Sequence, residues 1–171
     1  SREDEWLWGW DPTPGIVSVW ADEAGRVTVW RRLPGSDALI RDEDHFRPWL
    51  LLSSLEDLAG TGPAARFDIR ELEGPGALRY HVSGDHVRRL RDAVLLGASR
   101  RAGRRLGNLR ELGDARVLAL SAEEQYLVAS GRNYFRELAF DDLRRLQFDL
   151  ETTGLDATRH RIFMVAVRDH S

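Results

Sequence analysis

The sequence contains 171 residues, of which 42% are apolar and 31% charged, and its formal net charge is −3, a balance typical of a globular protein with one large or two small domains. The absence of cysteine excludes disulfides, thiolate catalysis and cysteine zinc sites, and we expect a cytoplasmic location. No apolar run approaches the roughly 18 residues of a membrane span, so we expect no membrane partner.

The first predicted element is a β-hairpin over about residues 16–31. Two β-prone runs, Ile16 to Trp20 and Arg26 to Arg31, flank a short connection in which Gly25 is expected at positive φ. Tryptophans precede this hairpin and end its strands, at Trp6, Trp8, Trp10, Trp20 and Trp30. Such side chains can stack on nucleic-acid bases, but we expect them to be buried by packing, because Trp carries a large apolar area.

The sequence pattern over about residues 48–120 predicts a module with the element order β-α-β-β-α-β. Its strands are expected at 48–54, 66–72, 78–82 and 116–120, its helices at 54–59 and from Asp85 to Gly97, and a glycine–proline breaker at 60–63. Asp85 should cap the second helix and Gly97 should end it. This order is that of a ferredoxin-like module, which RNA-recognition domains share, so the predicted class is α+β.

An arginine-rich stretch runs from His86 to Arg116. It contains nine Arg against three acidic residues, a local excess of six positive charges, and all 25 basic residues of the chain are Arg. The adjacent arginines are candidate phosphate contacts: Arg88, Arg89, Arg100, Arg101, Arg104 and Arg105. Such a stretch can line a nucleic-acid backbone, although runs of this kind are also common on solvated helix faces.

A capping box predicts the next helix, over about residues 122–131. Ser121 begins the box, Glu124 completes it, and Gly131 can stop the helix. Residues 132–145 then form a connector with a short helical turn that starts at Asp141. The connector leads into the last segment, residues 146–171.

The last segment predicts a second hairpin that carries two acidic residues. Leu146 to Glu151 should pair antiparallel with Ile162 to Val167, a run that is apolar on both faces like an interior strand. Because alternate residues of a strand share a face, Asp149 and Glu151 should project together. Two neighbouring carboxylates repel unless a cation lies between them, and a divalent ion bound by oxygen ligands is the simplest remedy.

Three motifs resemble those of one protein family. Phe148 to Leu155 (FDLETTGL) is similar to the first motif of the DEDD 3′-5′ exonucleases, which have a ribonuclease H-like fold. Phe46 to Leu52 (FRPWLLL) and Glu124 to Gly131 (EQYLVASG) resemble a strand and a helix in the N-terminal domain of family B DNA polymerases. The resemblance implies such an N-terminal domain over residues 1–131 and the opening hairpin of a proofreading exonuclease over 146–171.

The resemblance also implies roles for particular residues. Asp149 and Glu151 would coordinate catalytic Mg²⁺ or Mn²⁺, and the turn from Thr152 through Thr153 to Gly154 would bring backbone close to the terminal nucleotide. Leu155 would pack against the terminal base. The implied partner is DNA, as a single-stranded 3′ end or a primer-template. Because further metal ligands and the substrate channel are missing, we expect this fragment alone to be inactive.

Two other classes of protein remain open at this point. The first is a stand-alone DEDD exonuclease with an unrelated N-terminal domain, and the second is a non-enzymatic module that binds nucleic acid through the arginine-rich stretch. The later polymerase motifs are absent from this sequence, so polymerase activity of the intact protein is a separate question. The sequence makes no prediction of oligomeric state.

Overall fold

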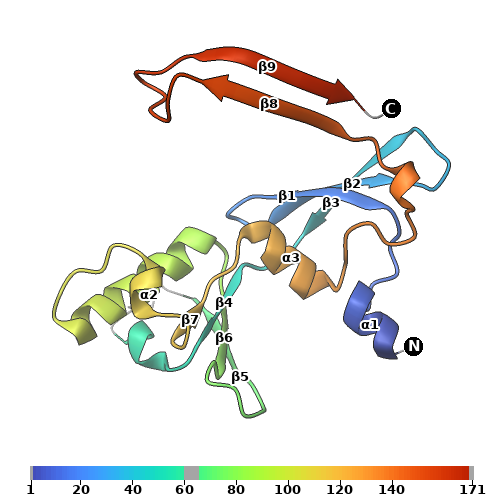
Figure 1. The fold of residues 1–171 in the computed structure, drawn as a ribbon. Helices are drawn as coiled ribbons and strands as arrows, with labels where there is room; N and C mark the ends of the chain where they lie inside the picture. The colour runs from blue at the N-terminus through green and yellow to red at the C-terminus, as the bar shows by residue number, and fades with distance from the viewer. Residues whose placement is uncertain (1, 60–65, 170–171) are drawn as a thin grey trace.

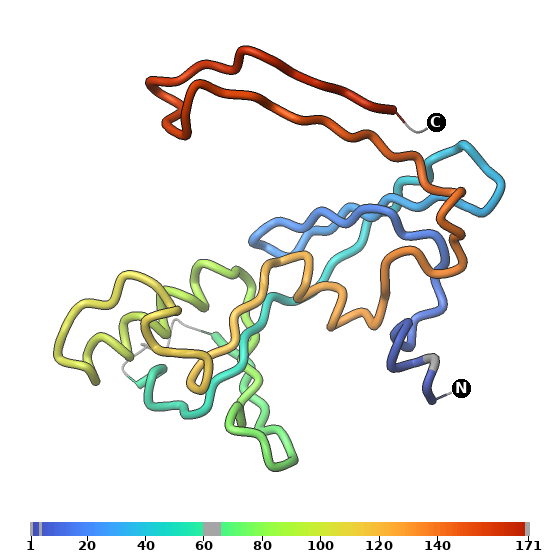
Figure 2. Tube along the Cα trace, in the orientation of Figure 1, coloured from blue at the N-terminus to red at the C-terminus, as the bar shows by residue number. Residues whose placement is uncertain are grey.

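The computed structural model describes residues 2–59 and 66–169, and the breaker predicted at 60–63 lies outside them. The chain combines helices with three antiparallel sheets, which is compatible with the predicted α+β class. Figures 1 and 2 show two packed subdomains side by side and a C-terminal hairpin that stands apart from both. No helix within the described ranges is long and apolar enough to cross a membrane.

The N-terminal sheet has the strand order β1-β2-β3, with bounds Ile16–Ala21, Arg26–Arg32 and Leu39–His45. The predicted positive φ of Gly25 is confirmed at 86°. A Cβ on Gly25 would lie 2.0 Å from the Phe46 carbonyl oxygen, so the turn requires glycine. The third strand was not predicted, because its charged sequence lacks a β pattern, and pairing with β2 creates it.

One face of this sheet is covered by α3 (Ala122–Ser130). Val19, Val27 and Val29 form a core there with Trp49 and Tyr126. The predicted capping box is confirmed, since the Ser121 hydroxyl accepts from the Glu124 N–H and the Glu124 carboxylate accepts from the Ser121 N–H. Gly131 ends α3 in the left-handed region, also as predicted.

The connector after α3 runs back along β1. The Phe135 N–H donates to the Ile16 carbonyl, and the Gly15 N–H donates to the Arg136 carbonyl, both at 2.9 Å. The predicted helical turn from Asp141 to Arg145 is wrong in its bounds. A 3₁₀ turn, η3, spans Phe140–Asp142 instead, because the Asp142 carboxylate accepts from the Ala139 N–H at 2.8 Å and fixes an earlier start.

The second sheet has the strand order β5-β6-β4-β7. Its strands span Asp68–Glu71 (β5), Tyr80–Ser83 (β6), Trp49–Leu52 (β4) and Val117–Leu118 (β7). α2 (Val87–Ala102) packs on it, and Leu90 and Val94 meet Leu52 and Val82 in a second core. The element predicted as a helix at 54–59 is a 3₁₀ turn, η1 (Leu55–Leu58), and η2 (Leu109–Leu112) is another.

Two predicted details of α2 are wrong. The cap is His86, whose Nδ1 accepts from the Arg88 N–H at 3.2 Å, whereas Asp85 pairs with Arg89. The helix does not stop at Gly97 but continues to a left-handed cap at Gly103. Gly97 is in fact a contact residue, because a Cβ there would lie 1.9 Å from the Asp57 carbonyl oxygen of η1.

A buried carboxylate joins these elements. The Asp57 side chain is 1% exposed, and its Oδ1 accepts from Arg101 Nε at 2.7 Å, while Arg116 lies 3.7 Å from Oδ2. The buried Nε of Arg116 has no hydrogen-bond partner among the described residues. Since a buried carboxylate without a cation is costly, this cluster fixes η1 against α2 and the start of β7.

The prediction that the tryptophans are buried is wrong for four of them. Trp6 is 85% exposed, Trp10 65%, Trp20 55% and Trp8 39%. Trp20 alternates with the buried Val19 and Ala21 along β1, so it lies on the face of the first sheet opposite to α3. Trp6 lies on α1 (Arg2–Trp8) at the N-terminus. Their apolar area contributes little to the core of this chain.

The C-terminal hairpin consists of β8 (Leu146–Thr152) and β9 (Ile162–Asp169), paired antiparallel as predicted. All strand residues of the hairpin are exposed, including Phe163 and Val165. Figure 1 shows it beyond the first sheet, joined to the rest of the chain through the connector. Its apolar residues on both faces therefore lack the cover that the sequence pattern predicts.

Candidate functional site

Asp149 and Glu151 occupy alternate positions of β8, opposite Ala166 and Met164 of β9. They therefore share a face of the hairpin, as the period of a strand requires. Both side chains are exposed, and neither forms an ion pair within the described part of the chain. Asp149 Oδ1 accepts only a local hydrogen bond, from the Leu150 N–H at 3.0 Å.

Carboxylate oxygens at this spacing are the type of ligand that Mg²⁺ or Mn²⁺ prefers. The number of ligands is too small, since no group of three or more His, Cys, Asp or Glu side chains occurs among residues 2–59 and 66–169. The pair thus fits part of a divalent metal site. Further oxygen ligands from elsewhere would have to complete it.

The turn after β8 is tightly hydrogen-bonded. The Thr152 hydroxyl donates to the Gly154 carbonyl at 2.8 Å, and the Thr153 hydroxyl accepts from the Arg161 N–H at 3.1 Å. A Cβ on Gly154 would lie 2.7 Å from the His160 ring, so a larger residue would displace that ring. Leu155 is fully exposed. The backbone of this turn is accessible beside the two carboxylates, and its Leu155 side chain is free to contact a ligand.

Most of the predicted phosphate contacts already have acidic partners. Arg88 lies 3.3 Å from Glu23, Arg89 2.6 Å from Asp85, and Arg104 2.9 Å from Glu111. Arg101 holds the buried Asp57. Arg100 and Arg105 line a shallow groove beside the C-terminal half of α2. The four paired arginines would have to share or give up a carboxylate in order to hold a phosphate.

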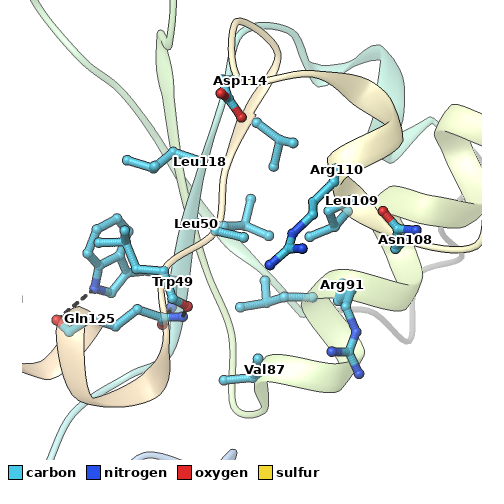
Figure 3. A pocket seen from close by; sticks show the side chains of 14 residues that line it. Trp49, Leu50, Val87, Arg91, Asn108, Leu109, Arg110, Asp114, Leu118 and Gln125 are labelled. Atoms are coloured by element: carbon cyan, nitrogen blue, oxygen red, sulfur yellow. Dashed lines mark hydrogen bonds between the residues drawn. The ribbon is translucent and has the colours of Figure 1, made fainter. Parts of the chain in front are cut away.

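A cavity of about 600 Å³ lies between the two subdomains. Its floor is apolar and includes Leu50, Leu90, Leu109 and Val117, and Figure 3 shows Trp49 on one wall. Gln125 of α3 anchors this wall, because its Oε1 accepts from the Trp49 N–H at 2.8 Å and its carbonyl accepts from the indole N–H at 3.1 Å. The wall is therefore fixed in place.

Two arginines that were not among the predicted contacts line this cavity. Figure 3 shows Arg110 reaching over the apolar floor and Arg91 near Val87. Neither arginine side chain forms an ion pair or hydrogen bond within the described ranges. The sequence did contain one signal, since Arg91 follows Val87 by four residues and so lies beside the buried stripe of α2. The position of Arg110 depends on tertiary folding.

A polar network joins α3, β3 and the segment before β1 in the first subdomain. The Tyr126 hydroxyl donates to Asp44 at 2.8 Å and accepts from Arg132 at 2.6 Å. Burial and the hydrogen bond to Asp44 raise the pKa of Tyr126 to about 12. Burial alone would raise the pKa of Asp11, but hydrogen bonds from Thr13 and the charge of Arg132 lower it. This network is fully paired and fixes structure.

The carboxylate pair on β8 and the arginines of the cavity beside α2 thus have side chains without a partner among the described residues. No family model and no curated protein matches the sequence. The chemistry of these two places is the basis for the functional interpretation.

Proposed function

We propose that the chain is the N-terminal part of a family B DNA polymerase-like protein, and that Asp149 and Glu151 belong to a metal-dependent 3′-5′ exonuclease site. The observation that carries this proposal is the pair of exposed carboxylates on one face of β8, without a cationic partner among the described residues. Asp149 and Glu151 would hold Mg²⁺ or Mn²⁺ together with ligands from outside the described segment. The ion would activate water for phosphodiester hydrolysis.

The residues after the pair would position the DNA end. The accessible backbone of Thr153 and Gly154 lies next to the carboxylates, and hydrogen bonds of Thr152 and Thr153 hold the turn in shape. A terminal nucleotide would approach this backbone from the side that the His160 ring leaves open. Leu155, which is fully exposed, would contact the terminal base.

The proposal includes a finer fold assignment. Residues 48–120 would form a ferredoxin-like module, which is supported by the insertion of β6 between β4 and β5, the arrangement of a split βαβ unit. The hairpin of β8 and β9 would open a ribonuclease H-like domain. The apolar residues on both faces of β9 support an interior position in such a domain.

In the test, the full-length protein is incubated with Mn²⁺ and a single-stranded DNA that is labelled at its 5′ end. We expect 3′ trimming that falls by at least about a hundredfold in Asp149→Ala, while Asp141→Ala, in the connector, behaves as wild type. Trimming that is unaffected by Asp149→Ala, or absent from the wild type, would contradict the proposal. The 171-residue chain alone should not trim DNA, and a stand-alone exonuclease would trim without polymerising.

Nucleic-acid binding by the folded body is the second candidate function. The unpaired Arg91 and Arg110 beside an apolar cavity favour it, because guanidinium groups hold phosphates and the floor can take an unstacked base. We expect salt-dependent binding of single-stranded DNA that Arg91→Glu weakens and Asp149→Ala leaves unchanged. Equal weakening by both substitutions would assign binding to the hairpin instead.

A further inference from the structure

The helix α1 presents an apolar pair of side chains to solvent. Trp6 is 85% exposed and Leu7 69%, although apolar residues of this size are usually covered. We call these two residues the Trp6–Leu7 knob. Glu3 and Glu5, also exposed, outnumber the exposed Arg2 and make the polar flank of the same helix net acidic. Exposed tryptophans are typical anchors at the centre of protein interfaces, and charged residues lie at the rims of such interfaces.

Backbone contacts hold the knob in place. The Asn133 side chain donates to the Leu7 carbonyl at 2.5 Å, and Arg136 Nη1 donates to the Trp8 carbonyl at 3.3 Å. Gly9 packs so closely on Gly131 that a Cβ would lie 1.9 Å from the Gly131 carbonyl oxygen. These contacts fix α1 through its main chain and leave its side chains available, so little conformational entropy is lost when the knob is covered.

A groove with complementary properties lies at the other end of the molecule. It runs along the C-terminal half of α2, has a volume of about 810 Å³, and we call it the Arg105 groove. Its apolar lining includes Leu95, Leu96 and Leu106, and its charged lining consists of Asp92, Arg100, Arg104 and Arg105. Arg105 has no hydrogen bond or ion pair with any residue that the structure describes. The groove is therefore apolar, and because Arg104 is paired with Glu111, its uncompensated positive charge is that of Arg105.

We infer that the Trp6–Leu7 knob of one molecule docks in the Arg105 groove of a second copy of this chain. The net acidic flank of α1 matches the positive charge of Arg105, and the apolar pair matches the leucines of the groove. Figure 1 shows α1 and α2 on opposite sides of the molecule, so the contact cannot form within one chain. Each molecule thus uses one surface as donor and another as acceptor, which gives head-to-tail chains.

The expected association is weak, because one small anchor buries less area than a standard interface, and its dissociation constant should lie between about 10 μM and 1 mM. Sedimentation velocity of the 171-residue chain measures it. The mean mass should rise with protein concentration at low ionic strength and fall when salt is added, because exposed charges contribute.

Two variants and their mixture give the decisive comparison. Trp6→Ala removes the knob and Arg105→Glu reverses the charge of the groove, and each should weaken association at least about tenfold. Mixed together, the two variants should form dimers but no longer chains, because one supplies an intact groove and the other an intact knob. Trp20→Ala, which removes another exposed tryptophan, from the first sheet, serves as the control and should associate like wild type.

Three results would overturn the inference. These are a wild type that stays monomeric up to about 1 mM, association that persists in both variants, and a mixture in which no dimer forms. Association that persists in both variants would identify the exposed β8–β9 hairpin as the surface through which the molecules associate. Circular dichroism of each variant confirms that loss of association does not come from unfolding.

Discussion

The two hairpins of this chain share their pairing but differ in their surroundings. In β1–β2 one face is buried under α3, with Val29 at 0% exposure, whereas every strand residue of β8–β9 is exposed. A fully buried aliphatic side chain contributes about 1.5–3 kcal/mol, and an isolated two-stranded hairpin is marginal in water. Strand pairing therefore follows from local sequence in both places, but only the first hairpin contributes to the core.

The largest expected difference comes from the same substitution in each hairpin. Ile16→Ala in β1 removes a side chain of 0% exposure and should lower the free energy of unfolding by about 2–5 kcal/mol. Ile162→Ala in β9 removes one that is 56% exposed and should change it by less than about 0.5 kcal/mol. Urea denaturation measures both, and equal losses would show that the second hairpin is part of the core.

Loss of one buried hydroxyl should have a smaller effect. Tyr126→Phe removes the hydrogen bonds to Asp44 and from Arg132, and should cost about 1–3 kcal/mol because both partners are charged. Thr153→Val in the turn of the second hairpin also removes a hydrogen bond, but in an exposed place, and should cost less than about 0.5 kcal/mol. Thermal unfolding of the two variants in parallel tests this order.

A smaller effect is expected from pH, because the free energy of unfolding depends on the protonation of His81 in β6. Burial, together with the nearby charge of Arg70, lowers the pKa of His81 from 6.5. The unfolded chain then binds a proton at higher pH than the folded chain, so this contribution is complete above about pH 6.5 and is lost as the pH falls through the folded pKa. His81→Phe can keep the stacking on Trp49 and should flatten the decline of stability below about pH 6.5. An unchanged decline would implicate other groups.

The smallest effect is expected at the carboxylate pair itself. Asp149→Asn and Glu151→Gln remove charges from an exposed strand without ion-pair partners among the described residues, so global stability should change by less than about 0.5 kcal/mol. Amide exchange in β8 should stay fast compared with β2 in wild type and variants alike. A large stability change would mean that the hairpin is packed against the body.

Much of the fold was predictable where a few neighbouring residues decide the structure. The cap at Ser121, the stop at Gly131 and the turn at Gly25 follow from local hydrogen bonds and φ. The continuation of α2 past Gly97 was not predictable, because that glycine serves contact with Asp57, a residue 40 positions away in the sequence. Strand β3 was missed for a similar reason, since its charged residues are held by β2 rather than by their own propensity.

The candidate sites also differ in whether the local sequence was sufficient to predict them. That Asp149 and Glu151 share a face follows from the period of one strand, so the sequence was sufficient. The approach of Arg91 and Arg110 to one cavity depends on how η2 folds back on α2, which no local pattern encodes. Pairs of adjacent arginines were a poor guide, because four of the six predicted residues are paired with acids, and two of these acids, Glu23 and Asp57, lie nearby only in the folded chain.

The connector that returns along β1 has a consequence for misassembly. It occupies the outer edge of β1 near Ile16, and the other edge of that sheet, β3, carries Arg41, Asp42, Glu43 and Asp44 in succession. A sheet edge that is covered and a sheet edge that is highly charged both disfavour the addition of strands from other molecules. Fibril growth, if it is induced, should therefore start from the C-terminal hairpin, and seeds made of residues 146–169 should recruit intact chains while seeds made of residues 16–45 should not.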